Sequence, residues 1–483
     1  MKRWRHTAAG LVCLAVLAAL PVGGLAQGNA AGGGPEVRVA DNVLLVPDKN
    51  ARSITGWLIV LAGCADEAGG QCVGLAHYLE HLLFINRDND HRSKVAFFAD
   101  GTGNGWTSHR ATTYLQRFPA RPDTNAANVD KLMGYFAGLL SDLKVEDGQA
   151  ARERNVVLQE YQQNTGRNPF ARFGIVLSRA LMPDEPLGQR VIGSPQTIAA
   201  FTVEAAQAFH QRWYARNNAI LVLHGPLDAA AIAPTVERHL APLAAKPIPN
   251  RAWQEARRYE PGRQLLRTRE KDARQTSVHL DRIVTFEETA SARGDNDAAL
   301  AVARSFLASR LAGSPVDAMV EREEIVTDAR LSVARVRQGT LRVTFSGTPA
   351  RGVAPEQVLE AARRYMSELS RNGIAQQTVD RLKLRIANER ALLAEQPALY
   401  AQALTGWLAA HYSHEAWTRR RAQHEAVTRA DVDRMLRLLG EEAREVAGIM
   451  LPGARTTAGS PADGRDTASP RPTVSSPAEA SPP

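Results

Sequence analysis

Two histidines and a glutamate form the pattern in this chain that is best suited to catalysis, within the segment GLAHYLEHLLF at residues 74–84. His77 and His81 are four residues apart, so on a helix both imidazole rings lie on one face and can bind a single metal ion. Zinc accepts two such nitrogens, and a catalytic zinc site adds one more protein ligand and keeps a position for water. Glu80 would reach that water without binding the metal. This H-x-x-E-H order predicts zinc-assisted hydrolysis with Glu80 as the general base.

A third metal ligand should be acidic and should lie on another helix further along the chain. The segment ERNVVLQE at residues 153–160 has helical propensity, and it places Glu153 and Glu160 two turns apart on one face. One of the two would bind the metal while the other supports a histidine. Both segments also have an interpretation without a metal. Residues 153–160 would then form a solvated acidic helix face, and residues 74–84 would form a buried helix whose histidines are hydrogen-bonded.

The elements that must position these residues alternate between strands and helices. Residues 37–46 alternate in polarity, and residues 53–61 form a β-rich apolar run. The other elements expected in the first half are a helix at 75–84, a Gly-rich strand at 101–118, helices at 126–143 and 148–164, and a strand at 219–224.

A second half of similar size follows a segment that contains three prolines. Its expected elements are a strand at 340–346 and helices at 355–371 and 377–393. Residues 246–262 predict a linker, because prolines there interrupt both helix and strand. The sequence therefore predicts an α+β fold in two domains, at 37–245 and 263–452.

Both ends of the chain differ in composition from this body. Residues 1–26 combine a basic start, an apolar run and small residues before a cleavage point, which is typical of a secretory signal peptide. A membrane anchor is the less favoured alternative because the run is short and contains Pro21. Residues 453–483, rich in Pro, Ser and Ala, predict a disordered tail. We expect export to a bacterial periplasm, without a membrane span in the mature chain.

The charge of the chain argues against one class of function, and its cysteines indicate a possible disulfide. The formal net charge is +8, but no block of Lys and Arg carries it, which argues against nucleic-acid binding. Cleavage after Ala26 would leave two cysteines, Cys64 and Cys72. An oxidising compartment favours a disulfide between them, and the alternative is two free thiols.

With these motifs in order, the chain resembles the pitrilysin (insulinase-like) zinc metallopeptidases, a family that includes the mitochondrial processing peptidases. Residues 74–84 resemble its zinc-binding helix, and GNGWT at 103–107 resembles its active-site edge strand. Residues 153–160 have the spacing of its distal acidic helix. The resemblance covers residues 37–452, and its remaining matches are Thr112, Tyr114, 186–188, 192–193, 213–218, Gly225, 372–374 and Lys383.

The resemblance implies a role for each motif residue. His77, His81 and Glu160 would bind one Zn²⁺ per chain. Glu80 would be the base, and Glu153 would support the ligands from outside. The fold implied is two related α+β domains, each with a mostly antiparallel sheet covered by helices.

The resemblance also implies how a substrate binds. The activity would be hydrolysis of peptides or small unfolded proteins. The substrate backbone would add to the edge strand, where Asn104 would contact it. Gly105 departs from the family pattern, which usually has Ala at this position.

The second half departs from the family more strongly. The family often has an Arg and a Tyr there that hold the substrate. Arg322 corresponds to the Arg, but Ala329 or Leu331 stands at the Tyr position. The chain is also half as long as the four-domain chamber of the family requires. We therefore expect a homodimer, or a heterodimer with a related subunit that supplies Arg and Tyr. The alternative function is an accessory or peptide-binding subunit with little activity alone.

Other histidines are weaker candidates. His411 and His414 precede Glu415, but no third ligand is evident nearby, so a surface helix is the favoured interpretation. His109 follows the edge strand, and it is a candidate donor in place of the missing Tyr.

Overall fold

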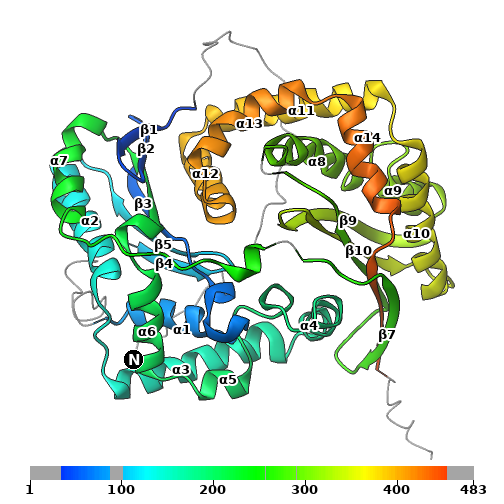
Figure 1. Cartoon of the computed structure of the whole chain (residues 1–483), viewed down its shortest axis with the longest axis horizontal. Coiled ribbons are helices and arrows are strands. Elements are labelled where there is room, and N and C mark those ends of the chain that lie inside the picture. Colours follow the sequence, from blue (N-terminus) through cyan, green and yellow to red (C-terminus); the bar gives the residue numbers. More distant parts are fainter. Residues whose placement is uncertain (1–33, 87–101, 256, 290, 454–483) are drawn as a thin grey trace, which may run out of the picture.

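A computed structural model of the chain describes residues 34–86, 102–255, 257–289 and 291–453 (Figure 1). The predicted signal peptide lies outside these residues, as does the predicted tail apart from Gly453. In the described part, no helix is both long and apolar enough to cross a membrane. Two sheets organise the described residues, one in each half of the chain.

The first sheet has the strand order β1-β2-β6-β3-β5-β4. Only β2 and β6 run parallel, and the other neighbours are antiparallel. The apolar run at 53–61 forms a central strand that is buried on both faces, which explains its continuous hydrophobicity. The strands are β1 (Val37–Ala40), β2 (Val43–Pro47), β3 (Ser53–Val60), β4 (Thr102–Thr107), β5 (Thr112–Pro119) and β6 (Ala219–Gly225).

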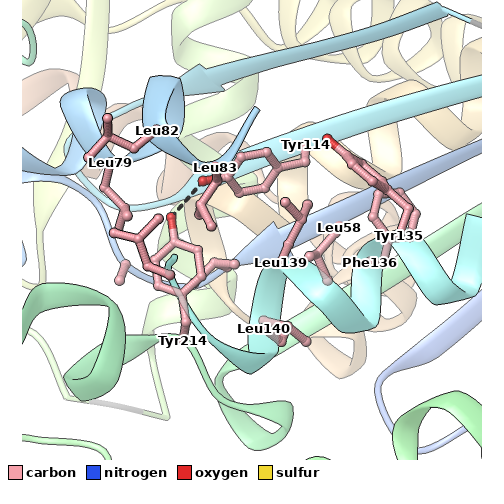
Figure 2. Close-up of a cluster of buried hydrophobic side chains, with 14 of the residues drawn as sticks. Leu58, Leu79, Leu82, Leu83, Tyr114, Tyr135, Phe136, Leu139, Leu140 and Tyr214 are labelled. Carbon is pink, nitrogen blue, oxygen red and sulfur yellow. Dashed lines mark hydrogen bonds between the residues drawn. The ribbon is translucent and has the colours of Figure 1, made fainter. Parts of the chain in front are cut away.

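Helices cover one face of this sheet and enclose the first hydrophobic core. Figure 2 shows part of this core, in which the hydroxyl groups of Tyr114 from β5 and Tyr214 form a hydrogen bond of 2.8 Å. The helices are α1 (Leu75–Leu83), α2 (Asn125–Ser141), α3 (Asp147–Tyr161), α5 (Pro195–Ala199), α6 (Val203–Trp213) and α7 (Ala229–Leu240). Apolar side chains of α1 point into this core, so its polar face is left for His77 and His81.

The second sheet has the strand order β7-β11-β8-β10-β9, in which only β7 and β11 are parallel. The predicted α+β fold with two related, mostly antiparallel sheets is thus confirmed. The strands are β7 (Gly262–Glu270), β8 (Ser277–Thr285), β9 (Val326–Arg337), β10 (Thr340–Pro349) and β11 (Arg444–Pro452). The helices of this half include α8 (Arg293–Leu307), α9 (Pro315–Asp317), α10 (Pro355–Asn372), α11 (Gln376–Ala394) and α14 (Arg429–Arg437).

The two halves exchange helices across their interface (Figure 1). Helix α4 (Pro169–Leu181) belongs to the first half, but its apolar residues pack against β8 and β11 of the second sheet. Helices α12 (Pro397–His411) and α13 (His414–Ala426) belong to the second half, and their apolar residues cover the outer face of the first sheet. Each half therefore completes the core of the other.

Two expected strands are divided by turns. Residues 37–46 form β1 and β2, which reverse at Asn42 with φ of 60°. The expected strand at 101–118 is a hairpin of β4 and β5, because the Ser108 hydroxyl binds both backbone groups of Ala111 and closes the turn. A single strand was thus the wrong prediction for either segment.

Candidate metal centre

Helices α1 and α3 lie against each other and bring three side chains together. The Tyr78 hydroxyl donates to the Ala150 carbonyl at 2.8 Å and ties the two helices. The Nε2 atoms of His77 and His81 each lie 3.5 Å from Glu160 Oε2. One ligand atom from each of the three residues lies within 4.8 Å of the others.

The charges of this cluster suit a divalent cation. Burial and the neighbouring His81 lower the pKa of His77 to about 4, so its imidazole is neutral and has a free lone pair. Burial also acts to lower the pKa of His81, but its bonds to Glu153 and Glu160 outweigh this and raise it to about 9. Without a metal, the proton on His81 supplies the positive charge. Two imidazoles and a carboxylate are the donor set of a catalytic zinc site.

Glu153 orients one of the two histidines. Its Oε2 lies 3.5 Å from His81 Nδ1, and the carboxylate is buried. Nδ1 of His77 is buried and has no hydrogen-bond partner among the described residues. Glu153 therefore fixes the ring of His81.

Glu80 is 5% exposed and lies between α1 and the edge strand β4. The Thr107 hydroxyl donates to its Oε2 at 2.7 Å. Burial raises the pKa of Glu80 to about 7, while the charge on His81 and the bond from Thr107 act in the opposite direction. A Cβ atom on Gly105 would lie 2.8 Å from Glu80 Oε1 and 3.0 Å from the Phe84 ring. The absence of a side chain at Gly105 thus leaves room for the carboxylate.

Strand β4 is the edge of the first sheet, and β5 is its only partner among the described strands. Asn104 is exposed on this strand, and its side-chain oxygen accepts from the Gly105 amide at 2.9 Å. Trp106 is 41% exposed on the same face. An open strand edge beside the metal centre can bind an extended peptide by main-chain hydrogen bonds.

The sequence pattern did not reveal Glu67, which holds the start of α1. Its buried carboxylate accepts from the amides of Val73, Gly74 and Ala76 at 2.6–3.1 Å. Burial raises the pKa of Glu67 to about 8, and these backbone bonds act in the opposite direction. Gly74 has φ of 100° and offers no capping side chain, so Glu67 satisfies the first amides of the helix.

Glu67 lies in the loop between the two cysteines. Cys64 and Cys72 have Cα atoms 4.8 Å apart, and their sulfurs are joined. Trp253 of the predicted linker donates to Asp66 in this loop at 2.8 Å. The loop thus connects the start of α1 to the chain between the halves. Oxidation of the pair in the exported protein stays a prediction, which peptide mapping without reductant would test.

Arg322 is not part of this cluster. It ends the helical turn after α9, is exposed and lies 3.7 Å from Asp317. Figure 1 places α9 and α1 on opposite sides of the molecule. Ala329 and Leu331 lie on β9 with buried side chains that face the second core. The residues at the Arg and Tyr positions of the family therefore lie away from the metal centre of the same chain.

The other histidine candidates have structural partners. His109 Nε2 lies 2.8 Å from the Gln189 carbonyl, so this ring is engaged by the backbone. His411 stacks on Trp407, with ring centroids 3.8 Å apart. His414 Nε2 lies 3.0 Å from Glu36 Oε1. Neither His411 nor His414 joins a metal-ligating group among the described residues.

Comparisons with known proteins concern the family and the fold. The sequence profile of the family "Insulinase (Peptidase family M16)" matches residues 42–194, and that of "Peptidase M16 inactive domain" matches residues 200–386. The zinc protease PqqE of Helicobacter pylori is 22% identical over 71% of this chain and 75% of its own length. The probable zinc protease PqqL of Escherichia coli is 26% identical over 41% of this chain. That match spans only 22% of PqqL, so the chain covers less than two thirds of this relative.

Solved structures share the fold. A protease from Helicobacter pylori aligns with a TM-score of 0.72 and 20% identity, over 87% of this chain and all (100%) of that one. The periplasmic protease PqqL from Escherichia coli aligns with a TM-score of 0.69 and 17% identity, over 90% of this chain and 49% of that one. At these identities the likeness concerns the fold alone.

Proposed function

The chain belongs to the insulinase family of M16 peptidases, and on this basis we propose that it is a zinc-dependent endopeptidase. One observation carries the proposal. His77, His81 and Glu160 converge within 4.8 Å, and Glu80 lies beside them under an open strand edge. Relatives named as zinc proteases support the same metal and the same reaction.

His77, His81 and Glu160 would hold one zinc ion, with Glu153 orienting His81. When bound, zinc supplies a Lewis acid that makes water more acidic and polarises a carbonyl group. The chain itself supplies the proton transfer. Glu80 takes a proton from the attacking water and gives it to the leaving amine, and a pKa of about 7 suits both steps near neutral pH. The Thr107 hydroxyl holds the Glu80 carboxylate in place between these two proton transfers.

The substrates that fit this site are peptides and small unfolded proteins. Strand addition to β4 requires an extended backbone with free amide and carbonyl groups, which folded domains rarely offer. Asn104 would contact this backbone from the edge strand. Side-chain preference at other positions depends on the surfaces next to the metal centre.

Export to the periplasm and assembly into dimers are part of the proposal. Three observations support export: the basic and apolar start of the chain, its paired cysteines and its similarity to the periplasmic protease PqqL. The structural match spans about half of PqqL, so two chains of this size would equal that protein. A related subunit would then supply the Arg and Tyr pair, because Arg322 lies away from the metal centre and Ala329 or Leu331 stands at the Tyr position.

The test is cleavage of an unstructured peptide by the purified, zinc-loaded protein and by Glu80→Gln. The wild type should cleave, and Glu80→Gln should retain zinc but lose activity by about 10²- to 10⁴-fold, which is the usual contribution of a general base. The second candidate function is an accessory peptide-binding subunit, and the distance of Arg322 from the centre favours it. Peptide binding by a zinc-loaded wild type that cleaves nothing, alone or with related subunits, would establish that function instead.

A further inference from the structure

A cavity of about 390 Å³ lies next to the start of α1. Its walls come from the residues just before α1, from the end of α4 and from the segment that leads into α5. Val73 links it directly to the metal-binding helix, and the Thr197 hydroxyl donates to the Val73 carbonyl at 2.7 Å. This volume is at the lower end of the range for small-ligand sites and is large enough for an amino-acid side chain.

The cavity wall is connected to the turn that follows the edge strand. Strand β4 ends at Thr107, and this turn carries His109. The His109 ring bonds to the carbonyl of Gln189, and Gln189 lines the cavity. One hydrogen bond therefore joins the end of the edge strand to the wall of the cavity.

Arg190 lies in the cavity wall and is half-buried. Its carbonyl accepts from the Gly193 amide at 3.0 Å, but its guanidinium has no hydrogen bond or ion pair among the described residues. Burial lowers the pKa of Arg190, and the neighbouring Tyr161 and Glu160 act in the opposite direction. Glu160 would give its charge to the metal, which would leave less negative charge near Arg190. Arg179 and Asp184 also line the cavity, which leaves one positive charge in excess.

We propose that this cavity is a substrate subsite for a carboxylate group, which pairs with Arg190. The group is either the side chain of Asp or Glu near the scissile bond or the C-terminal carboxylate of the peptide. A guanidinium binds a carboxylate with two parallel hydrogen bonds, so Arg is well suited to select it. The inference rests on the proposed peptidase function, and it adds a preference for anionic substrates.

The experiment uses zinc-loaded protein and peptides that differ at one position. Glu is moved through the positions on both sides of the scissile bond and replaced by Gln, and each peptide is made with a free or an amidated C-terminus. The wild type should prefer the carboxylate at one position by about tenfold or more in kcat/KM, the usual effect of a hydrogen bond to a charged group. A preference for internal Glu identifies the side chain, and a preference for the free acid identifies the C-terminus.

Arg190→Gln should remove this preference and leave cleavage of the neutral peptide within about twofold. Arg190→Lys should keep part of it. Arg351→Gln, at an exposed arginine in the turn after β10, is the matched control and should change nothing. Equal cleavage of charged and neutral peptides by the wild type would overturn the subsite. An equal loss for every peptide in Arg190→Gln, with a loss of zinc, would also overturn it and assign Arg190 to the metal centre.

A wild type that cleaves none of these peptides would contradict the proposed peptidase, and a binding measurement then tests the subsite separately. Fluorescence anisotropy with labelled peptides compares the wild type and Arg190→Gln, both loaded with zinc. Tighter binding of the anionic peptide by the wild type alone supports the subsite. Binding that does not depend on Arg190, or no binding at all, contradicts it.

Discussion

Glu80 is held by its neighbours on the edge strand as well as by its own helix. Thr107 donates to one carboxylate oxygen, and Gly105 leaves space beside the other. Burial keeps the carboxyl group near the pKa at which it can both take and release a proton. In the proposed reaction the edge strand would thus have two roles, because it would bind the substrate backbone and hold Glu80 in place.

Gly105→Ala tests this arrangement at the scale of one methyl group. The new Cβ would lie 2.8 Å from Glu80 Oε1, so the carboxylate or the Phe84 ring must move. We expect kcat to fall on the order of ten- to a hundredfold, since a misplacement of about 1 Å can cost this much. Zinc content should not change. Gly148→Ala is the control because its Cβ would meet no atom within 4 Å. An unchanged kcat in Gly105→Ala would mean that Glu80 adapts without loss.

Glu153 gives a second prediction at this scale. It is buried beside His81 Nδ1, at 3.5 Å, and should fix the ring for metal binding. Glu153→Gln should weaken zinc binding by about 10- to 100-fold, the usual effect of removing such a partner. Competition with a chromogenic chelator measures the affinity. Zinc binding equal to that of the wild type would show that packing alone orients His81.

At the scale of elements, α1 depends on a loop that precedes it. Gly74 provides no capping side chain, and Glu67 accepts three amides at the start of the helix. The joined Cys64 and Cys72 close this loop, so they restrict where Glu67 can lie. The position of His77, in the first turn, follows from this contact.

Glu67→Ala should therefore loosen the first turn of α1. Loss of a helix cap costs about 0.5–2 kcal/mol, and we expect faster hydrogen exchange at the amides of residues 73–78 together with weaker zinc binding. Glu395→Ala, at an exposed glutamate after α11, is the control. Unchanged exchange in Glu67→Ala would show that the loop holds α1 without this carboxylate.

The metal ligands could be predicted because their spacing is local. Residues four or seven apart on a helix share a face. The spacing of His77 and His81, and that of Glu153 and Glu160, therefore predicts that each pair lies on one face of its helix. Glu67 could not be found in this way, because it binds backbone amides and no residue type marks its partners. An apolar helix face likewise does not reveal which sheet it covers, and the exchange of α4 and α12 was therefore not foreseen.

At the scale of the whole molecule, this exchange makes the two halves depend on each other. Helix α12 comes from the second half and packs on the outer face of the first sheet. Helix α4 leaves the first half directly after the helix that carries Glu160 and packs on the second sheet. Unfolding of either half would expose the core of the other, so we expect one cooperative transition.

Leu404→Ala tests this dependence. Leu404 on α12 is 0% exposed, and removal of a buried leucine side chain costs about 2–5 kcal/mol. Thermal unfolding should shift to lower temperature, and zinc release from the first half should shift with it. Leu399→Ala, on the same helix and 49% exposed, should change little. Zinc release that keeps its wild-type midpoint in Leu404→Ala would show that the halves unfold independently.

The zinc content of the purified protein tests the proposed metal centre most directly, because every role proposed for the first half depends on the metal. The protein is stripped with a chelator, dialysed against zinc and measured by elemental analysis beside His81→Ala. We expect one zinc per wild-type chain and a large loss in His81→Ala, since two imidazoles and one carboxylate would form the site. Equal zinc in both proteins, or none in the wild type, would contradict it.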